Sequence, residues 1–234
     1  GLGRHNGLLA SVDEACLKRL HQHLERVHLK QGQVVIDADA PLTRIWFPET
    51  CVVSLAIQME NGNSAEVAAI GPEGALGYDA LLGIRRSLIQ ATVQAPGDAL
   101  YIATRDFMPM MEESDRLRIA MWRNMARIQA ETMQLAACHA LHPARARLAR
   151  FLLMAQDRTG EPVMHLTQEL LAEVLGVQRT TVTAAALALM EQGLILYRRG
   201  RIDICNRPGL EAAACECYAA IRQFSRYTAP SPCN

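Results

Sequence analysis

The sequence has no apolar run long enough to cross a bilayer, which takes about 18 to 20 consecutive apolar residues, and no signal-peptide pattern at its start. Its formal net charge at neutral pH is zero, which argues against a surface that binds any polyanion without selectivity. From these absences we expect a cytoplasmic protein that has no membrane partner.

Histidine is missing from a long central stretch, between His28 and His139. A β-barrel enzyme of the cupin type holds its metal through several histidines, so this gap excludes a histidine-ligated metal in the central region. We find no Ser-His-Asp set, phosphate-binding loop or paired-carboxylate motif on matching elements. The sequence therefore predicts no catalytic residue, no metal site and no enzyme activity.

A disulfide framework is also excluded, because the seven cysteines form an odd set scattered over both halves of the chain. Cys215 and Cys217 form a CxC pair, with Cys233 close to the C-terminus. A CxC pair alone is a weak metal or redox signature, and free thiols are the interpretation that we favour.

Residues 166–205 carry the most informative pattern in the chain. Thr167 is a good N-cap for a short apolar helix, and Gly176 can end that helix in the left-handed conformation. A second helix is expected from about Gln178 to Gln192. Apolar runs on both sides of Gly200 then predict a β-hairpin. This order is typical of a winged helix-turn-helix, a DNA-binding unit.

The predicted second helix presents polar side chains at its N-terminus, where a recognition helix contacts base edges in the major groove. Arginines at the hairpin suit contacts with phosphate. The residues that we expect to contact DNA are Thr167, Gln178, Arg179, Thr180, Thr181, Thr183, Arg198, Arg199 and Arg201.

Two alternatives fit part of the same pattern. An amphipathic helical hairpin used for packing, with solvated arginines on its surface, would share the apolar spacing, but it does not require the alanine, the glycine, the exposed polar helix start and the basic wing to occur in this order. A nucleotide-sensing module that acts through protein partners, with a degenerate winged helix that has lost DNA binding, would share both the spacing and this order. Charge is uneven in the direction that DNA binding requires, because residues 140–234 carry 11 arginines against 8 acidic residues.

Short β-prone runs between residues 29 and 102 predict a small antiparallel barrel or roll. The runs are separated by turn signals and cover residues 34–36, 45–47, 51–57, 65–70, 91–93 and 99–102. Before them, apolar spacing over residues 11–28 predicts a helix capped by Ser11.

No glycine or proline interrupts residues 115–142, which predict one long helix. An apolar stripe along it forms a seam that could contact the roll or a second copy of the helix. The seam residues that we expect in a dimer are Leu117, Met121, Met125, Ile128 and Leu135. Pro143 marks the joint to a following helix over residues 143–157. One face of this helix is apolar, and Arg145, Arg147 and Arg150 lie outside that face.

These patterns predict an α+β fold: an effector-type β-roll over 8–114, a long dimerisation helix over 115–142, a winged helix-turn-helix over 143–210, and a C-terminal helix and tail over 211–234. Their order resembles the Crp/Fnr family of bacterial transcription regulators over residues 8–210. The resemblance implies a homodimer on a pseudo-palindromic operator in double-stranded DNA, with RNA polymerase as a further partner.

Within the roll, residues 71–77 resemble the phosphate cassette of this family, and residues 91–93 resemble the strand that closes it. Cyclic-nucleotide binders of the family carry an Arg-Ser pair where this chain has Ile89-Gln90. The resemblance therefore implies a nucleotide-type effector other than cyclic AMP, or none. The residues expected around an effector are Glu73, Gly74, Leu76, Gly77, Arg85, Arg86, Ser87 and Gln90.

The recognition helix departs from the family as well. Many members have Arg-Glu-Thr and a later arginine, whereas this chain has Arg179-Thr180-Thr181 and Ala184. We therefore expect a different operator. The iron-sulfur sensors of this family need a cluster of N-terminal cysteines as ligands. This chain offers only Cys16 there, which disfavours iron-sulfur sensing. Haem ligation by His21, His23, His28 or His139 stays open, although solvated or helix-capping roles suit these histidines better.

Overall fold

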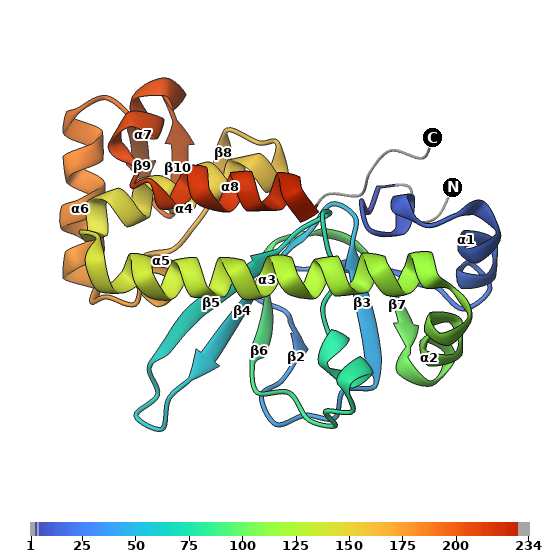
Figure 1. The fold of residues 1–234 in the computed structure, drawn as a ribbon. Helices are drawn as coiled ribbons and strands as arrows, with labels where there is room; N and C mark the ends of the chain where they lie inside the picture. Colours follow the sequence, from blue (N-terminus) through green and yellow to red (C-terminus); the bar gives the residue numbers. More distant parts are fainter. Residues whose placement is uncertain (1–2, 4, 229–234) are drawn as a thin grey trace. The chain divides into compact units, whose positions relative to one another are not determined.

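The computed structural model describes residue 3 and residues 5–228 (Figure 1). Contacts divide these residues into two compact units, one built mainly from residues 5–57 and 68–129 and the other from residues 58–67 and 130–224. The predicted α+β fold, with antiparallel sheets, one long helix and a C-terminal helix-turn-helix, is confirmed. In the described part of the chain no helix combines the length and the apolarity needed to span a bilayer.

Two antiparallel sheets form the roll. The first has the order β1-β7-β3, made of Glu25–Leu29, Gly97–Ala103 and Arg44–Pro48. The second has the order β2-β6-β4-β5, made of Val34–Ile36, Gln90–Ala95, Val52–Gln58 and Ser64–Ile70. Short 3-10 helices cover Leu9–Ser11 (η1) and Tyr78–Leu82 (η2).

The predicted N-terminal helix over residues 11–28 is wrong in extent. Helix α1 covers Glu14–Leu20, and Asp13 rather than Ser11 is its N-cap, accepting a hydrogen bond from the Cys16 amide at 2.9 Å. Residues 25–29 are instead strand β1, in register with β7. Pairing with β7 outweighs the helical spacing of Leu24 and Val27, because a strand in a sheet satisfies its backbone groups through its neighbour.

Helix α2 covers Thr104–Glu113 and the long helix α3 covers Asp115–Leu141, close to the predicted bounds. The roll core includes Phe47, Leu100, Ile102 and Phe107, which all have 0% exposure. Ser114 separates the two helices, and its hydroxyl accepts a hydrogen bond from the Leu117 amide at 3.2 Å, which starts α3.

The predicted dimer seam on α3 needs correction. Leu117 and Met121 have 0% exposure and pack into the core of the first unit, whereas Leu135 belongs to the core of the second unit. Ile128 is buried at 4%, and Met125 is half-buried. Four of the five side chains are enclosed by their own chain and cannot contact a second copy in this arrangement, so the stripe serves mainly the fold of the single chain.

A second apolar stripe runs along the opposite face of α3. Its residues are spaced three or four positions apart, which places them on one side of a helix with 3.6 residues per turn. Its large side chains are exposed: Ile119 by 43%, Trp122 by 55% and Met133 by 61%. Alanines fill the positions between and beyond them, so that the α3 stripe comprises Ile119, Trp122, Ala126, Ala130, Met133, Ala137 and Ala140.

The second unit continues with α4, which covers Ala144–Thr159, and with Pro143 at its N-cap. Helix α5 covers Gln168–Leu175 and α6 covers Arg179–Glu191. A three-stranded sheet of order β8-β10-β9 is formed by Val163–His165, Arg201–Ile204 and Ile195–Arg198. Helices α7 (Arg207–Ala213) and α8 (Cys217–Thr228) complete it.

Three features of this unit differ from expectation. Strand β8 was not anticipated, and neither was α7, which starts inside the predicted DNA-binding domain. Arg147 and Arg150, placed off the apolar face of their helix, are buried at 8% and 3% exposure. Cys233 lies outside the described residues.

Candidate DNA-binding site

Helices α5 and α6 are joined by the predicted glycine turn. The Thr167 hydroxyl accepts a hydrogen bond from the Leu170 amide at 3.2 Å, which caps α5. Gly176 has φ of 60°, and the amide of Val177 donates to the carbonyl oxygen of Ala172 at 3.1 Å. A left-handed residue with this bond ends a helix and fixes the direction of the next one. The turn therefore sets the angle at which α6 leaves α5.

A buried arginine also holds this turn, which the sequence did not indicate. Arg147 on α4 donates from Nη1 to the carbonyl oxygen of Leu175 at 2.8 Å. That carbonyl belongs to the last turn of α5, where carbonyl groups receive no hydrogen bond from an amide of the same helix. Burial lowers the pKa of Arg147 from its ordinary value, and the guanidinium attaches the turn to α4.

The first turn of α6 is exposed and contains no acidic residue. Its inner face packs through Val182, Ala185, Ala186 and Leu189. Each residue predicted to contact DNA is exposed, namely Thr167, Gln178, Arg179, Thr180, Thr181, Thr183, Arg198, Arg199 and Arg201. The N-terminus of a helix carries partial positive charge, so this end of α6 favours an anionic partner.

Arg179 is held beside the start of α5. Its Nη1 lies 2.8 Å from a carboxylate oxygen of Glu169, and the two side chains are 65% and 57% exposed. The backbone amide of Glu169 and then the charge of Arg179 lower the pKa of this carboxyl. An ion pair this exposed contributes little to stability, so Arg179 can exchange Glu169 for a base edge or a phosphate.

Thr183 already has hydrogen-bond partners. Its hydroxyl donates to the Arg179 carbonyl oxygen at 3.0 Å and accepts from Nε2 of Gln168 at 3.2 Å. Gln168 and Glu169 were not predicted as site residues. Their position in the first turn of α5, opposite the start of α6, is the signal that could have found them.

The wing ends in a tight turn whose two central residues both have positive φ, 49° at Arg199 and 75° at Gly200. Such turns match the twist of a two-residue hairpin. The wing is fixed to the start of α5, because the Leu166 amide donates to the Gly200 carbonyl oxygen at 2.7 Å. The Tyr197 hydroxyl also donates to the Leu166 carbonyl oxygen, at 3.3 Å.

Like charges face each other across the wing. Arg198 and Arg201 are direct partners in the register of β9 and β10, an arrangement that destabilises an isolated hairpin. Arg201 is offset by Asp203, whose carboxylate lies 3.0 Å away, but Arg198 and Arg199 add positive charge at the tip. The wing and the start of α6 are both exposed and both carry arginines, and both lie beside the start of α5, where Glu169 pairs with Arg179 and shares a groove with Arg199.

The predicted effector residues are placed in two groups. In the 71–77 segment, Asn124 of α3 both donates to the carbonyl oxygen of Ala75 (3.0 Å) and accepts from its amide (3.1 Å). Glu73 lies 3.5 Å from Arg127 of α3. An added Cβ at Gly74 would lie 2.5 Å from both α3 side chains. Leu76 is buried and Gly77 has φ of 82°, so the segment is fixed against α3.

The second group lies on a loop paired with residues 37–41. Arg86 donates to the carbonyl oxygen of Asp39 at 2.6 Å and forms an exposed ion pair with its carboxylate. Ser87 is buried and donates to the Ile89 carbonyl oxygen at 2.8 Å. Arg85 is exposed, and Nε2 of Gln90 lies 3.5 Å from Asp37. The Arg86 and Ser87 side chains are thus engaged with their own loop.

Comparison with known proteins agrees with this geometry. Residues 146–213 match the model of the Crp-like helix-turn-helix domain. FixK2 from Bradyrhizobium japonicum superposes with a TM-score of 0.71 at 16% identity, over 82% of this chain and 98% of its own. No curated protein matches the chain by sequence.

Two further structures superpose over most of the chain. A putative Crp/Fnr regulator from Eubacterium rectale has a TM-score of 0.71 at 19% identity, covering 90% of this chain and 98% of its own. TTHA1359, a Crp/Fnr-family transcriptional regulator from Thermus thermophilus, has a TM-score of 0.67 at 23% identity, covering 81% and 98%. Residues 146–213 are therefore a Crp-like helix-turn-helix domain, in a chain that has the fold of the Crp/Fnr transcription regulators.

Proposed function

We propose that the protein is a homodimeric transcription regulator of the Crp/Fnr type that binds a pseudo-palindromic site in double-stranded DNA. The observation that carries the proposal is the exposed surface that the start of α6 and the wing form on either side of the start of α5. It contains Arg179 and three threonines on α6, with three arginines on the wing beside them.

The two parts of this surface suit two kinds of contact. Inserted by its N-terminus into the major groove, α6 brings Arg179 to base edges, where arginine donates to two acceptors of guanine. Threonine hydroxyls suit phosphate, and threonine methyl groups suit the methyl of thymine. The wing arginines contact phosphate and contribute affinity that depends on salt but not on sequence.

A dimer follows from the α3 stripe rather than from the predicted seam. Ile119, Trp122 and Met133 are large apolar side chains left in water on one face of a 27-residue helix. The intervening alanines permit close approach of a second helix. Two copies paired along this face would present two recognition helices. The half-sites that such dimers bind lie about one DNA turn, roughly 34 Å, apart.

For control of the regulator we infer a nucleotide-type effector other than cyclic AMP, or none. The support is the engagement of Arg86 and Ser87 with their own loop, since a cyclic phosphate needs a cation and a hydroxyl directed at it. Such a regulator works in the cytoplasm, where it meets the chromosome and RNA polymerase.

The experiment that tests this function is selection of bound DNA from a random pool by the purified protein, with and without candidate nucleotides. We expect enrichment of a two-fold symmetric site whose half-sites are about one helical turn apart. A site that tightens with one nucleotide identifies the effector. No enrichment, with binding to protein partners instead, would favour the alternative of a winged helix that has lost DNA binding.

A further inference from the structure

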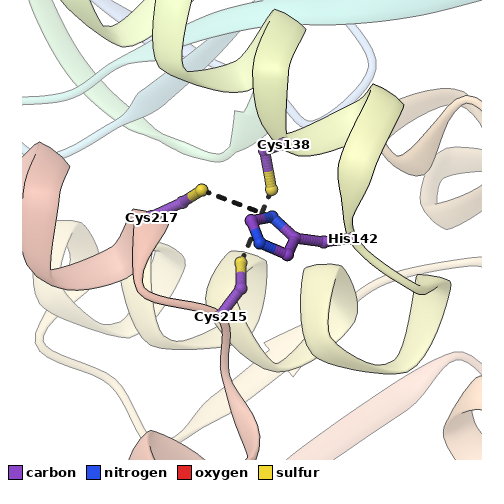
Figure 2. Close-up of side chains that lie close together, drawn as sticks. All are labelled: Cys138, His142, Cys215 and Cys217. Carbon is purple, nitrogen blue, oxygen red and sulfur yellow. Dashed lines mark hydrogen bonds between the residues drawn. The ribbon is translucent and has the colours of Figure 1, made fainter.

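Four side chains with metal-ligating atoms meet in the second unit (Figure 2). Cys138 lies in the last turn of α3, and His142 directly follows the last residue of that helix, with its amide donating to the Cys138 carbonyl oxygen at 3.0 Å. Cys215 lies between α7 and α8, and Cys217 is the first residue of α8. The four ligand atoms all lie within 4.8 Å of one another.

Two of the six distances between the ligand atoms are close to the edges of a tetrahedron around one small ion. The sulfur atoms of Cys138 and Cys215 are 3.5 Å apart, and Sγ of Cys217 lies 3.5 Å from Nδ1 of His142. With zinc bonds of about 2.3 Å to sulfur and about 2.0 Å to nitrogen, ideal tetrahedral edges are about 3.8 Å between two sulfurs and about 3.5 Å between sulfur and nitrogen. Only small shifts of side chains would be needed to complete the site.

The donor set and its burial narrow the choice of metal. Cys138, Cys215 and Cys217 are 0%, 7% and 1% exposed, which makes an inner sphere closed to water. Three thiolates and one imidazole in tetrahedral order are ligands that zinc prefers, whereas calcium and magnesium take oxygen. His142 has a side chain 20% exposed, which leaves a path by which the ion can enter.

The surrounding hydrogen bonds are those of a metal ligand shell. While Nδ1 of His142 faces Cys217, its Nε2 lies 3.2 Å from a carboxylate oxygen of Glu216. Histidines that bind a metal through one nitrogen commonly donate from the other to a carboxylate, which fixes the tautomer and the ring. Gln134 donates from Nε2 to Sγ of Cys217 at 3.1 Å, a bond that favours a thiolate.

The electrostatics are also suited to a charged metal centre. Arg150 is 3% exposed, its Nη1 donates to the sulfur of Met154, and its Nε has no hydrogen-bond partner among the described residues. Arg150 lies close enough to Cys138 and Cys215 for its charge to act on both sulfur atoms. Three thiolates, one neutral imidazole and a divalent ion carry a net charge of about −1, which this guanidinium would balance.

We propose that Cys138, His142, Cys215 and Cys217 bind one zinc ion in a structural site. Because all four positions of the tetrahedron are filled by protein, no open position is left for catalysis. The thiols release their protons to solvent as the ion binds. The ion would fasten the start of α8 to the end of α3, next to the joint at Pro143.

The test is metal analysis of the full, untagged chain, purified under reducing conditions and dialysed against metal-free buffer. We expect one zinc ion per chain, and cobalt in its place should give thiolate-to-metal charge transfer and the visible bands of tetrahedral cobalt. Cys215→Ser, Cys217→Ser and His142→Ala should each lose the ion. Cys205→Ser, the matched control at an exposed thiol of the same unit, and Cys233→Ser should keep it.

Two further measurements apply if the ligand variants fail to fold. Glu216→Gln should bind zinc about 10- to 100-fold more weakly with the fold intact, as expected for a group that orients a ligand. Chelation of the natural protein should expose Cys138, Cys215 and Cys217 to a thiol reagent, and added zinc should restore their protection. Failure of the reduced chain to take up zinc or cobalt, or a Cys138–Cys215 disulfide in protein that binds no metal, would overturn the proposal.

Discussion

Arg179 is the residue on which the proposed DNA recognition depends most. It is exposed at the start of α6, and its partner Glu169 is also exposed. An ion pair this exposed contributes little to stability, so the guanidinium can leave Glu169 at small energetic cost.

We predict that Arg179→Ala weakens binding to the selected site by about 10- to 100-fold and relaxes the base preference at one position of each half-site, as loss of a bidentate contact to guanine would. Electrophoretic or anisotropy titrations against the selected site and its single-base variants measure this. Arg105→Ala removes a similarly exposed arginine, 87% exposed, from α2 and should change neither quantity. An Arg179→Ala protein with unaltered base preference would rule out direct base contact by this residue.

Gly176 is a second position where one residue decides local geometry. Its φ of 60° lies in the left-handed region, where an added Cβ costs about 1–2 kcal/mol. Gly176→Ala should lower the free energy of unfolding of the second unit by about that amount in a urea titration. Gly176→Asn should cost less, since asparagine tolerates this conformation; equal losses in the two variants would contradict the account given for the turn.

At the scale of elements, the wing carries positive charge that its own strands do not balance. Arg198 faces Arg201 across the hairpin, and Arg199 lies in the turn. If these arginines contact phosphate, they affect the salt dependence of DNA binding rather than the base preference.

For the wing we predict that the double change Arg198→Gln and Arg199→Gln weakens binding to all DNA sequences alike. It should reduce the slope of log affinity against log salt by about two, one for each lost phosphate contact. Arg226→Gln, at an exposed position on α8, serves as the control and should leave the slope as it is. A change of base preference without a change of slope would place the wing away from phosphate.

Helix α3 has two apolar faces, and the structure separates their roles. The face with Leu117 and Met121 belongs to the core of the chain, and the α3 stripe with Trp122 and Met133 lies in water. A second copy can pair with the α3 stripe while the face with Leu117 and Met121 stays packed in the core of its own chain.

At the scale of the whole molecule, we predict that Trp122→Glu combined with Met133→Glu converts a dimer into monomers in sedimentation, because charges would be buried at a helix interface. Affinity for the symmetric site should fall, while weak half-site binding stays. Leu88→Glu, which changes an apolar residue 82% exposed outside α3, should remain dimeric. A Trp122/Met133 variant that sediments as a dimer would require the interface to lie elsewhere.

The winged helix-turn-helix could be predicted from the sequence because its signals are local. Thr167 caps its own helix, Gly176 permits its own turn, and Gly200 with its flanking strands defines the hairpin. The apolar spacing of α5 and α6 similarly needs no knowledge of distant residues. The antiparallel strands after residue 29 followed from the same kind of signal, namely short β-prone runs between turn residues.

What the tertiary structure decided depends on residues far apart in the chain. Pairing with β7 made residues 25–29 a strand. Packing within the single chain buried most of the predicted seam on α3, and a periodic sequence pattern cannot distinguish such a core face from a dimer seam. Cys138 and Cys215 are 77 positions apart, and no spacing rule connects them. Local chemistry fixes the caps and turns of the winged helix-turn-helix, whereas the extent of the N-terminal helix, the covered face of α3 and the meeting of distant ligands are set by pairing and burial across the whole fold.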